Sequence, residues 1–202
     1  GGFNDYSPLP KDVYNDVKVF QGRMFWISPQ SLVFSDRNNV FSYPLRNSVT
    51  CPNGEFRGMI VHYFFGETVQ NGNIVVFGSK ETYIGVFTGN KIASPIQVSP
   101  DTVASFDLDG SDFVLSAKTT VTAFSSKSAI VAEGELYFWG PTGVYFDDGI
   151  GIPEKISVDL EPDIFSLYDP NKTEDITCQY LEETKEIVWF YQKKGSTTGK
   201  SS

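Results

Sequence analysis

Residues 134–148 read GELYFWGPTGVYFDD, two short aromatic-rich segments joined by a Gly-Pro-Thr-Gly turn. Aromatic and β-branched side chains fit the pleated, half-buried surface of a strand, whereas Gly and Pro mark the turn between two strands. The stretch therefore predicts a hairpin with strands over 135–140 and 144–147, to which residues 128–132 add a third strand.

The same module recurs along the chain. Further copies lie at 22–36 and 72–87, and a weaker one at 182–194. Their starts are roughly 50 to 60 residues apart, close to the repeat of about 40 to 50 residues in propeller blades. One small sheet cannot bury both of its faces, and radial stacking of several sheets can do so. We predict an all-β fold of antiparallel, propeller-like blades; a β-sandwich and other all-β folds are the alternatives.

The predicted domain organisation has three parts. Residues 1–16 are an N-terminal extension, 17–192 the propeller-like domain and 193–202 a flexible Gly, Ser, Thr and Lys tail. We place the blades near 17–57, 58–110, 111–160 and 161–192. Propellers usually have about four to eight blades, so we expect part of a larger or incomplete propeller. The remaining predicted strands are 17–20, 23–28, 31–35, 59–65, 73–78 with 82–88, 112–117 paired with 121–125, and 176–181 paired with 186–192, with loops over 36–57 and 160–175.

Charge and cysteine content narrow the possible functions. The chain has 25 Asp and Glu against 16 Lys and Arg, a formal net charge of -9. An acidic surface does not bind phosphate backbones, although it could line a channel through which DNA slides without adhering. There is no run of 18 apolar residues, so we expect no membrane insertion. Cys51 and Cys178 are expected to be free thiols, with a single disulfide as the alternative.

Sequence motifs typical of catalytic, phosphate-binding or metal-binding sites are scarce. His62 is the only histidine and lies in an apolar run, which is typical of a buried strand histidine. Residues 195–201 resemble a phosphate loop, but they have three residues between the glycines where the motif needs four. Asp107, Asp109 and Asp112 resemble a calcium loop whose Gly comes too early, and we interpret them as an acidic turn, leaving cation binding open. We predict no catalytic, cofactor or metal site and no enzymatic activity.

Several of these stretches are similar to the tail tube, or nozzle, proteins of short-tailed bacteriophages. The resemblance rests on the order and spacing of Gly, aromatic and Ser positions across most of residues 17–192. The similar stretches are 19–26 leading to 32–36, 72–83, and 128–145 continuing to Ile156 and Ser157.

This resemblance implies a virion structural protein located in the phage tail. It implies a homo-oligomeric ring, a hexamer, that contacts other tail and adaptor proteins and encloses a conduit for genome ejection, through which DNA passes without specific binding. Aromatic residues of the predicted loops, Phe41, Tyr43, Phe165 and Tyr168, are the candidate interface residues, with ordinary loop packing as the alternative. A carbohydrate-binding or glycoside-cleaving propeller is the alternative function, and a generic interaction propeller is the third.

Overall fold

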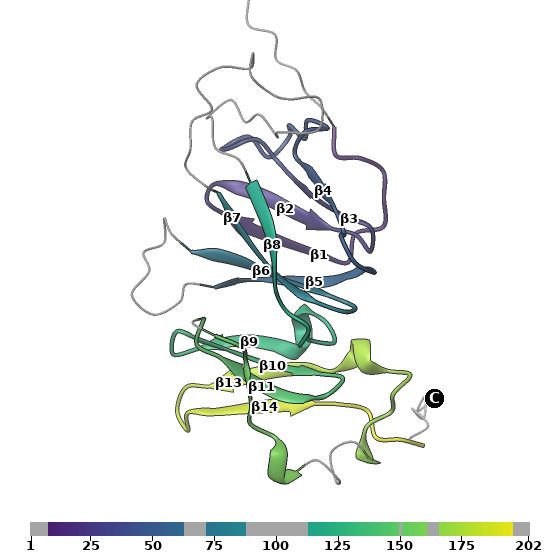
Figure 1. Cartoon of the computed structure of the whole chain (residues 1–202), viewed down its shortest axis with the longest axis vertical. Coiled ribbons are helices and arrows are strands. Elements are labelled where there is room, and N and C mark those ends of the chain that lie inside the picture. Colours follow the sequence, from purple (N-terminus) through teal and green to yellow (C-terminus); the bar gives the residue numbers. More distant parts are fainter. Residues whose placement is uncertain (1–7, 63–71, 88–112, 150, 161–165, 196–202) are drawn as a thin grey trace, which may run out of the picture.

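A computed structural model describes residues 8–62, 72–87, 113–149, 151–160 and 166–195 of the chain (Figure 1). Over these residues the fold is built of β-strands in four antiparallel sheets, with short 3-10 turns between some of them. The all-β prediction is therefore confirmed. In the same ranges, no helix has the length and apolar character needed to cross a membrane.

Each sheet is a simple meander, in which strands adjacent in the sequence are adjacent in the sheet. The first sheet contains β1 (Asp16–Phe20), β2 (Arg23–Ile27), β3 (Ser31–Phe34) and β4 (Ser48–Thr50). The second contains β5 (Phe56–His62), β6 (Asn73–Gly78), β7 (Thr82–Phe87) and β8 (Phe113–Thr119). The third contains β9 (Ala129–Ala132), β10 (Glu135–Gly140), β11 (Gly143–Asp147) and β12 (Glu154–Lys155), and the fourth contains β13 (Thr177–Leu181) and β14 (Glu186–Phe190).

Two-residue turns set the register of the leading hairpins. Gln21 and Gly22 join β1 to β2 with φ values of 47° and 74°, and Glu133 and Gly134 join β9 to β10 with φ values of 53° and 86°. Positive φ at both central residues is the type I′ arrangement, whose twist matches that of the flanking strands. These turns explain why the predicted hairpins at 17–28 and 128–140 form where the sequence places them.

The pairing predicted for residues 112–117 with 121–125 is wrong. Strand β8 pairs with β7, with Phe113 opposite Phe87, so it closes the second sheet. Residues 121–125 form no strand and cross to the third sheet, where the Phe124 N–H donates to the Trp139 carbonyl. The predicted loop 36–57 also needs correction, because it contains β4 and the start of β5.

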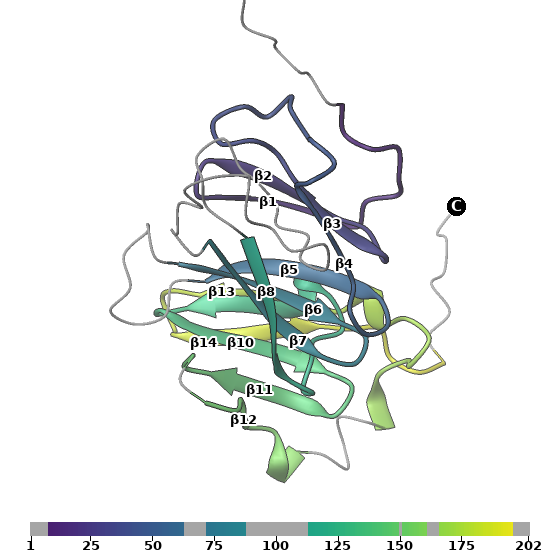
Figure 2. The same cartoon turned by 45° about the horizontal axis from the view of Figure 1, so that its top comes forward.

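Side chains that alternate along the central strands bury both faces of the second and third sheets. On β6, Ile74 and Val76 face the first sheet, whereas Val75 and Phe77 face the third. Successive residues of a strand point to opposite faces, so a run of four buried apolar residues needs a neighbouring sheet on each side. Figures 1 and 2 show the resulting stack, with the first sheet over the second and the third beyond it.

Three apolar clusters fill the spaces between successive sheets. The first contains a group of phenylalanine rings, among which Phe25 lies 5.2 Å from Phe34 and 5.4 Å from Phe113 between centroids. The second is centred on Phe77 and Phe138, and the third on Trp139. The first strands of the sheets also lie side by side, β1 beside β5, β5 beside β9 and β9 beside β13.

Gly140 lies close to residues 121–125, the segment that crosses from the second sheet to the third (the crossing segment). This contact allows a test of the packing. A Cβ at Gly140 would lie 1.8 Å from the Thr122 carbonyl oxygen, whereas a Cβ at Gly151 would have no atom within 4 Å. We expect Gly140→Ala to lower the free energy of unfolding by about 2 kcal/mol or more, because the backbone at Thr122 must move. Gly151→Ala should stay within about 0.5 kcal/mol of the wild type. Urea denaturation measures both values, and equal losses in the two variants would contradict this packing.

Candidate functional site

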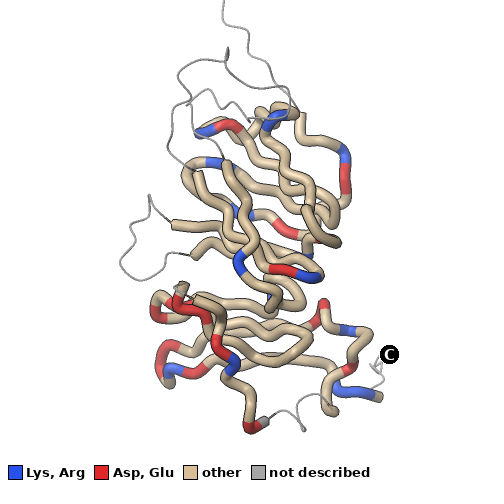
Figure 3. Tube along the Cα trace, in the orientation of Figure 1, with Lys and Arg blue, Asp and Glu red and all other residues tan. Residues whose placement is uncertain are grey.

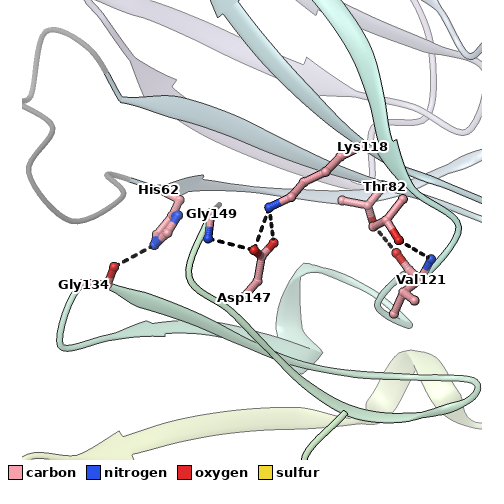
Figure 4. Close-up of polar contacts among 8 residues, drawn as sticks. His62, Thr82, Lys118, Val121, Gly134, Asp147 and Gly149 are labelled. Carbon is pink, nitrogen blue, oxygen red and sulfur yellow. Dashed lines mark hydrogen bonds and ion pairs between the residues drawn. The ribbon is translucent and has the colours of Figure 1, made fainter. Parts of the chain in front are cut away.

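The polar side chains buried between the second and third sheets form the candidate site that the structure defines best (Figure 4). They come from β5, β7, β8 and β11 and from the segment 121–125 that crosses between the two sheets. We call this group the polar seam; it consists of His62, Thr82, Lys118, Thr122 and Asp147. Buried polar groups are costly unless they are hydrogen-bonded, so their partners decide what the site can do.

His62 ends β5 and has an exposed fraction of 0%. Its Nε2 lies 3.0 Å from the carbonyl oxygen of Gly134, in the β9–β10 turn of the third sheet. A carbonyl oxygen only accepts hydrogen bonds, so Nε2 carries the proton and donates it. Burial lowers the pKa of His62 below 6.5 and outweighs the opposing effect of the Gly134 carbonyl. The neutral ring therefore joins two sheets.

Lys118 and Asp147 form a buried ion pair between β8 and β11. The Lys118 ammonium donates to both carboxylate oxygens at 2.6 Å, and the side chains are 12% and 2% exposed. The Gly149 N–H also donates to Asp147 at 2.8 Å. These bonds offset part of the cost of removing a carboxylate from water. The pair thus fixes the position of the second sheet against the third.

Two threonine hydroxyls tie the crossing segment to the second sheet. Thr82 donates to the Val121 carbonyl and Thr122 donates to the Gly78 carbonyl, both at 2.7 Å. Each bond joins residues about 40 positions apart in the chain and satisfies a main-chain acceptor at the sheet boundary. Together with His62 and the Lys118–Asp147 ion pair, these two hydrogen bonds fix the position of the second sheet relative to the third.

A small open pocket lies between the third and fourth sheets. It is lined by Ala132, Glu133, Tyr137, Ile156, Tyr180, Lys185, Ile187 and Trp189. The Lys185 ammonium and the Tyr180 hydroxyl both donate to Oε1 of Glu133, at 2.6 and 3.0 Å. These bonds, that from Lys185 above all, lower the pKa of Glu133. Glu133 therefore stays ionised, which is the opposite of the raised pKa of a glycosidase general acid.

The predicted interface residues have different environments. Phe41 is 72% exposed, whereas Tyr43 is 5% exposed and its hydroxyl accepts a hydrogen bond from Trp26 Nε1 at 2.9 Å. Tyr168 is 9% exposed and packs on Phe124 and Trp139. Phe165 lies outside the described residues. The structure thus leaves the Phe41 ring in solvent and places the two tyrosines in intramolecular packing.

Both cysteines are free thiols, as predicted. Burial raises the pKa of Cys178 to about 12, so its thiolate is scarce near neutral pH. Asp107, Asp109 and Asp112 lie outside the described residues. Within those residues, no group of three His, Cys, Asp or Glu side chains is placed to hold a metal ion.

Sequence reasoning identified His62 as a buried strand residue, which is confirmed, but it missed the other members of the polar seam. The Lys118–Asp147 pair joins residues 29 apart on two different sheets, so no local motif announces it. The Glu133–Lys185 contact joins two turns 52 residues apart. Only Glu133-Gly134 carried a local signal, as a turn between two strands.

The ion pair predicts a non-additive response to mutation. Lys118→Met leaves the Asp147 carboxylate buried without its cation, and we expect a loss on the order of 3 kcal/mol in the free energy of unfolding. Adding Asp147→Asn to this variant removes the buried charge and keeps an acceptor for the Gly149 N–H, so stability should partly return. A double-mutant cycle in urea measures this coupling; additive losses would show that the pair is not coupled.

The lowered pKa of His62 predicts a pH-dependent contribution to stability. The unfolded state, with a pKa near 6.5, binds a proton before the folded state does, so protonation favours unfolding as the pH falls below about 6.5. The difference in unfolding free energy between wild type and His62→Gln should shrink from pH 8 to pH 5, with a slope of at most about 1.4 kcal/mol per pH unit. Urea titrations at each pH measure this difference, and a constant difference would contradict the assignment.

Comparison of the sequence with models of known protein families finds no match, and comparison with curated proteins finds none either.

Proposed function

We propose that this chain is a structural subunit of a bacteriophage tail, of the nozzle or tail tube type, which assembles with further copies into a ring. The ring forms a conduit for genome ejection and a platform for other tail proteins. The observation that carries the proposal is the stack of three four-stranded meanders and one two-stranded sheet, in which the two central sheets are buried on both faces. The three stretches that resemble nozzle proteins lie, in order, in the first, second and third sheets.

We further infer a propeller-like, radial arrangement of the sheets. In a propeller, the sheets surround a central channel, so the same strand of each blade lies closest to the axis. The first strands β1, β5, β9 and β13 are neighbours in that order, which supports such an arrangement. The fourth sheet has two described strands where the others have four, which fits an incomplete propeller.

The charge distribution is compatible with a conduit for DNA. The net charge is -9, and Figure 3 shows acidic segments at the ends of the third and fourth sheets where their hairpin turns lie. A wall of this sign repels phosphate groups and leaves DNA free to slide. The side chains of the polar seam lie between sheets, where they stabilise the packing. This use of polar side chains also fits a structural role.

The oligomeric state tests the proposal. Mass photometry of the purified protein, followed by negative-stain microscopy of the largest species, is expected to reveal ring-shaped oligomers of defined size. Assembly should persist at moderate salt concentrations, because obligate interfaces of about 2,000 Å² or more are largely apolar. A monomer that hydrolyses chromogenic glycosides would overturn the structural role.

The pocket between the third and fourth sheets favours a second candidate function, carbohydrate binding. Three aromatic side chains, Tyr137, Tyr180 and Trp189, line it together with the ionised Glu133 and Lys185. Aromatic surfaces with a few polar groups are typical of small-ligand sites. Glycan-array binding that Tyr180→Ala abolishes would support this function, and a blank array would oppose it.

A further inference from the structure

Exposed large apolar side chains gather at the two ends of the sheet stack. Among the described residues, one group belongs to the first sheet and its flanking segments, and a second to the third and fourth sheets. The first group is Val13, Val17, Val19, Val40, Phe41 and Leu45, and the second is Ile152, Ile156, Val158, Phe190 and Tyr191; Val114 is the one such residue outside both. Contiguous apolar surface on a folded protein marks an interaction site.

Val17 and Val19 of the first group lie on the outer face of the first sheet, which no other described sheet covers. Val17 pairs with Trp26 and Val19 with Met24 across β1 and β2, and these four side chains point away from the phenylalanine cluster. Tyr14 lies 5.6 Å from Trp26 between centroids and so covers part of this face. Val17 and Val19 remain 40% and 65% exposed. The outer face of the first sheet therefore exposes apolar side chains to solvent.

The second group includes the outer face of the fourth sheet. On β14, Trp189 donates from Nε1 to the Ser128 carbonyl and so faces the third sheet. Val188 and Phe190 alternate with Trp189, and therefore point outward. Phe190 is 55% exposed. On this face, as on the outer face of the first sheet, apolar side chains occupy alternate positions of the strand. In the central sheets, side chains at such positions are buried against a neighbouring sheet.

The two ends carry opposite formal charges. Residues 8–50 contain, apart from the buried Arg23, four Lys and Arg and three Asp and Glu, a balance of +1. Residues 166–195 contain four Lys and six Asp and Glu, a balance of -2. Contact between unlike ends is thus favoured, whereas contact between like ends opposes like charges.

We propose that the outer face of the first sheet in one copy of this chain packs against the outer face of the fourth sheet in a second copy. The contact centres on Val17 and Val19 of one copy and on Val188 and Phe190 of the other. It extends the series of apolar clusters between sheets across the boundary between two molecules. A head-to-tail contact of this kind generates rings when its rotation closes, so the inference rests on the ring assembly proposed above and names its surfaces.

Single-cysteine cross-linking tests the contact. In a Cys51→Ser, Cys178→Ser background, Val19→Cys protein is mixed with Phe190→Cys protein and treated with a short bismaleimide. Covalent dimers are expected in the mixture and in neither protein alone. Val114→Cys, which replaces an exposed apolar residue of β8 outside both ends, is the matched control and should not link to either partner.

Charge substitutions separate this inference from the proposed function. Val19→Asp and Phe190→Lys should each weaken assembly at least tenfold in mass photometry, whereas Val114→Asp should leave it unchanged. If rings form but neither cross-linking nor these variants respond, the surfaces are wrong and the ring assembly stands. Dimers in the Val19→Cys protein alone would replace the head-to-tail contact with a two-fold one. A protein that stays monomeric at all concentrations would overturn both proposals.

Discussion

Burial of both faces of small antiparallel sheets is the constraint on which this structure depends. Strand β6 presents Ile74 and Val76 to one side and Val75 and Phe77 to the other, all with an exposed fraction of 0%. A sheet with this pattern cannot be stable with one face in water, because each large apolar side chain contributes about 1.5–3 kcal/mol when buried. It needs a sheet on each side, and the chain supplies them before and after it in the sequence.

Hydrogen bonds and an ion pair between the sheets help to hold this stack in register. Apolar packing alone is non-directional and tolerates sliding, whereas a hydrogen bond is sensitive to distance and angle. His62 and the Lys118–Asp147 pair add that direction between the second and third sheets. Within the first sheet, the buried Arg23 donates to the Ser35 carbonyl at 3.2 Å and lies 4.7 Å from the centroid of the Phe87 ring of the second sheet. Desolvation makes each arrangement costly to rearrange, so these residues specify one relative placement.

The stack ends at the outer faces of the first and fourth sheets, and these two faces are the link between the fold and the proposed assembly. The central sheets find both neighbours inside the chain, but the first and fourth sheets find only one among the described residues. Apolar residues such as Val19 and Phe190 therefore remain in solvent for the same geometric reason that Val75 and Phe77 are buried. Repetition along one direction thus produces both a stable core and terminal faces with exposed apolar side chains. These exposed faces are the surfaces that the proposed ring assembly would use.

The sequence by itself determined the all-β class, most of the strands and the hairpins at 17–28 and 128–140, because these follow from local alternation of apolar side chains and from turn residues such as Gln21-Gly22 and Glu133-Gly134. It also indicated the burial of His62 from its apolar neighbours. Only the tertiary structure decided that β8 joins β7, that 121–125 crosses between sheets, and that Lys118 meets Asp147. It also placed Tyr43 and Tyr168 in packing and Phe41 in solvent. These outcomes depend on which sheets face each other, and contacts between residues far apart in the chain leave no periodic signal in the sequence.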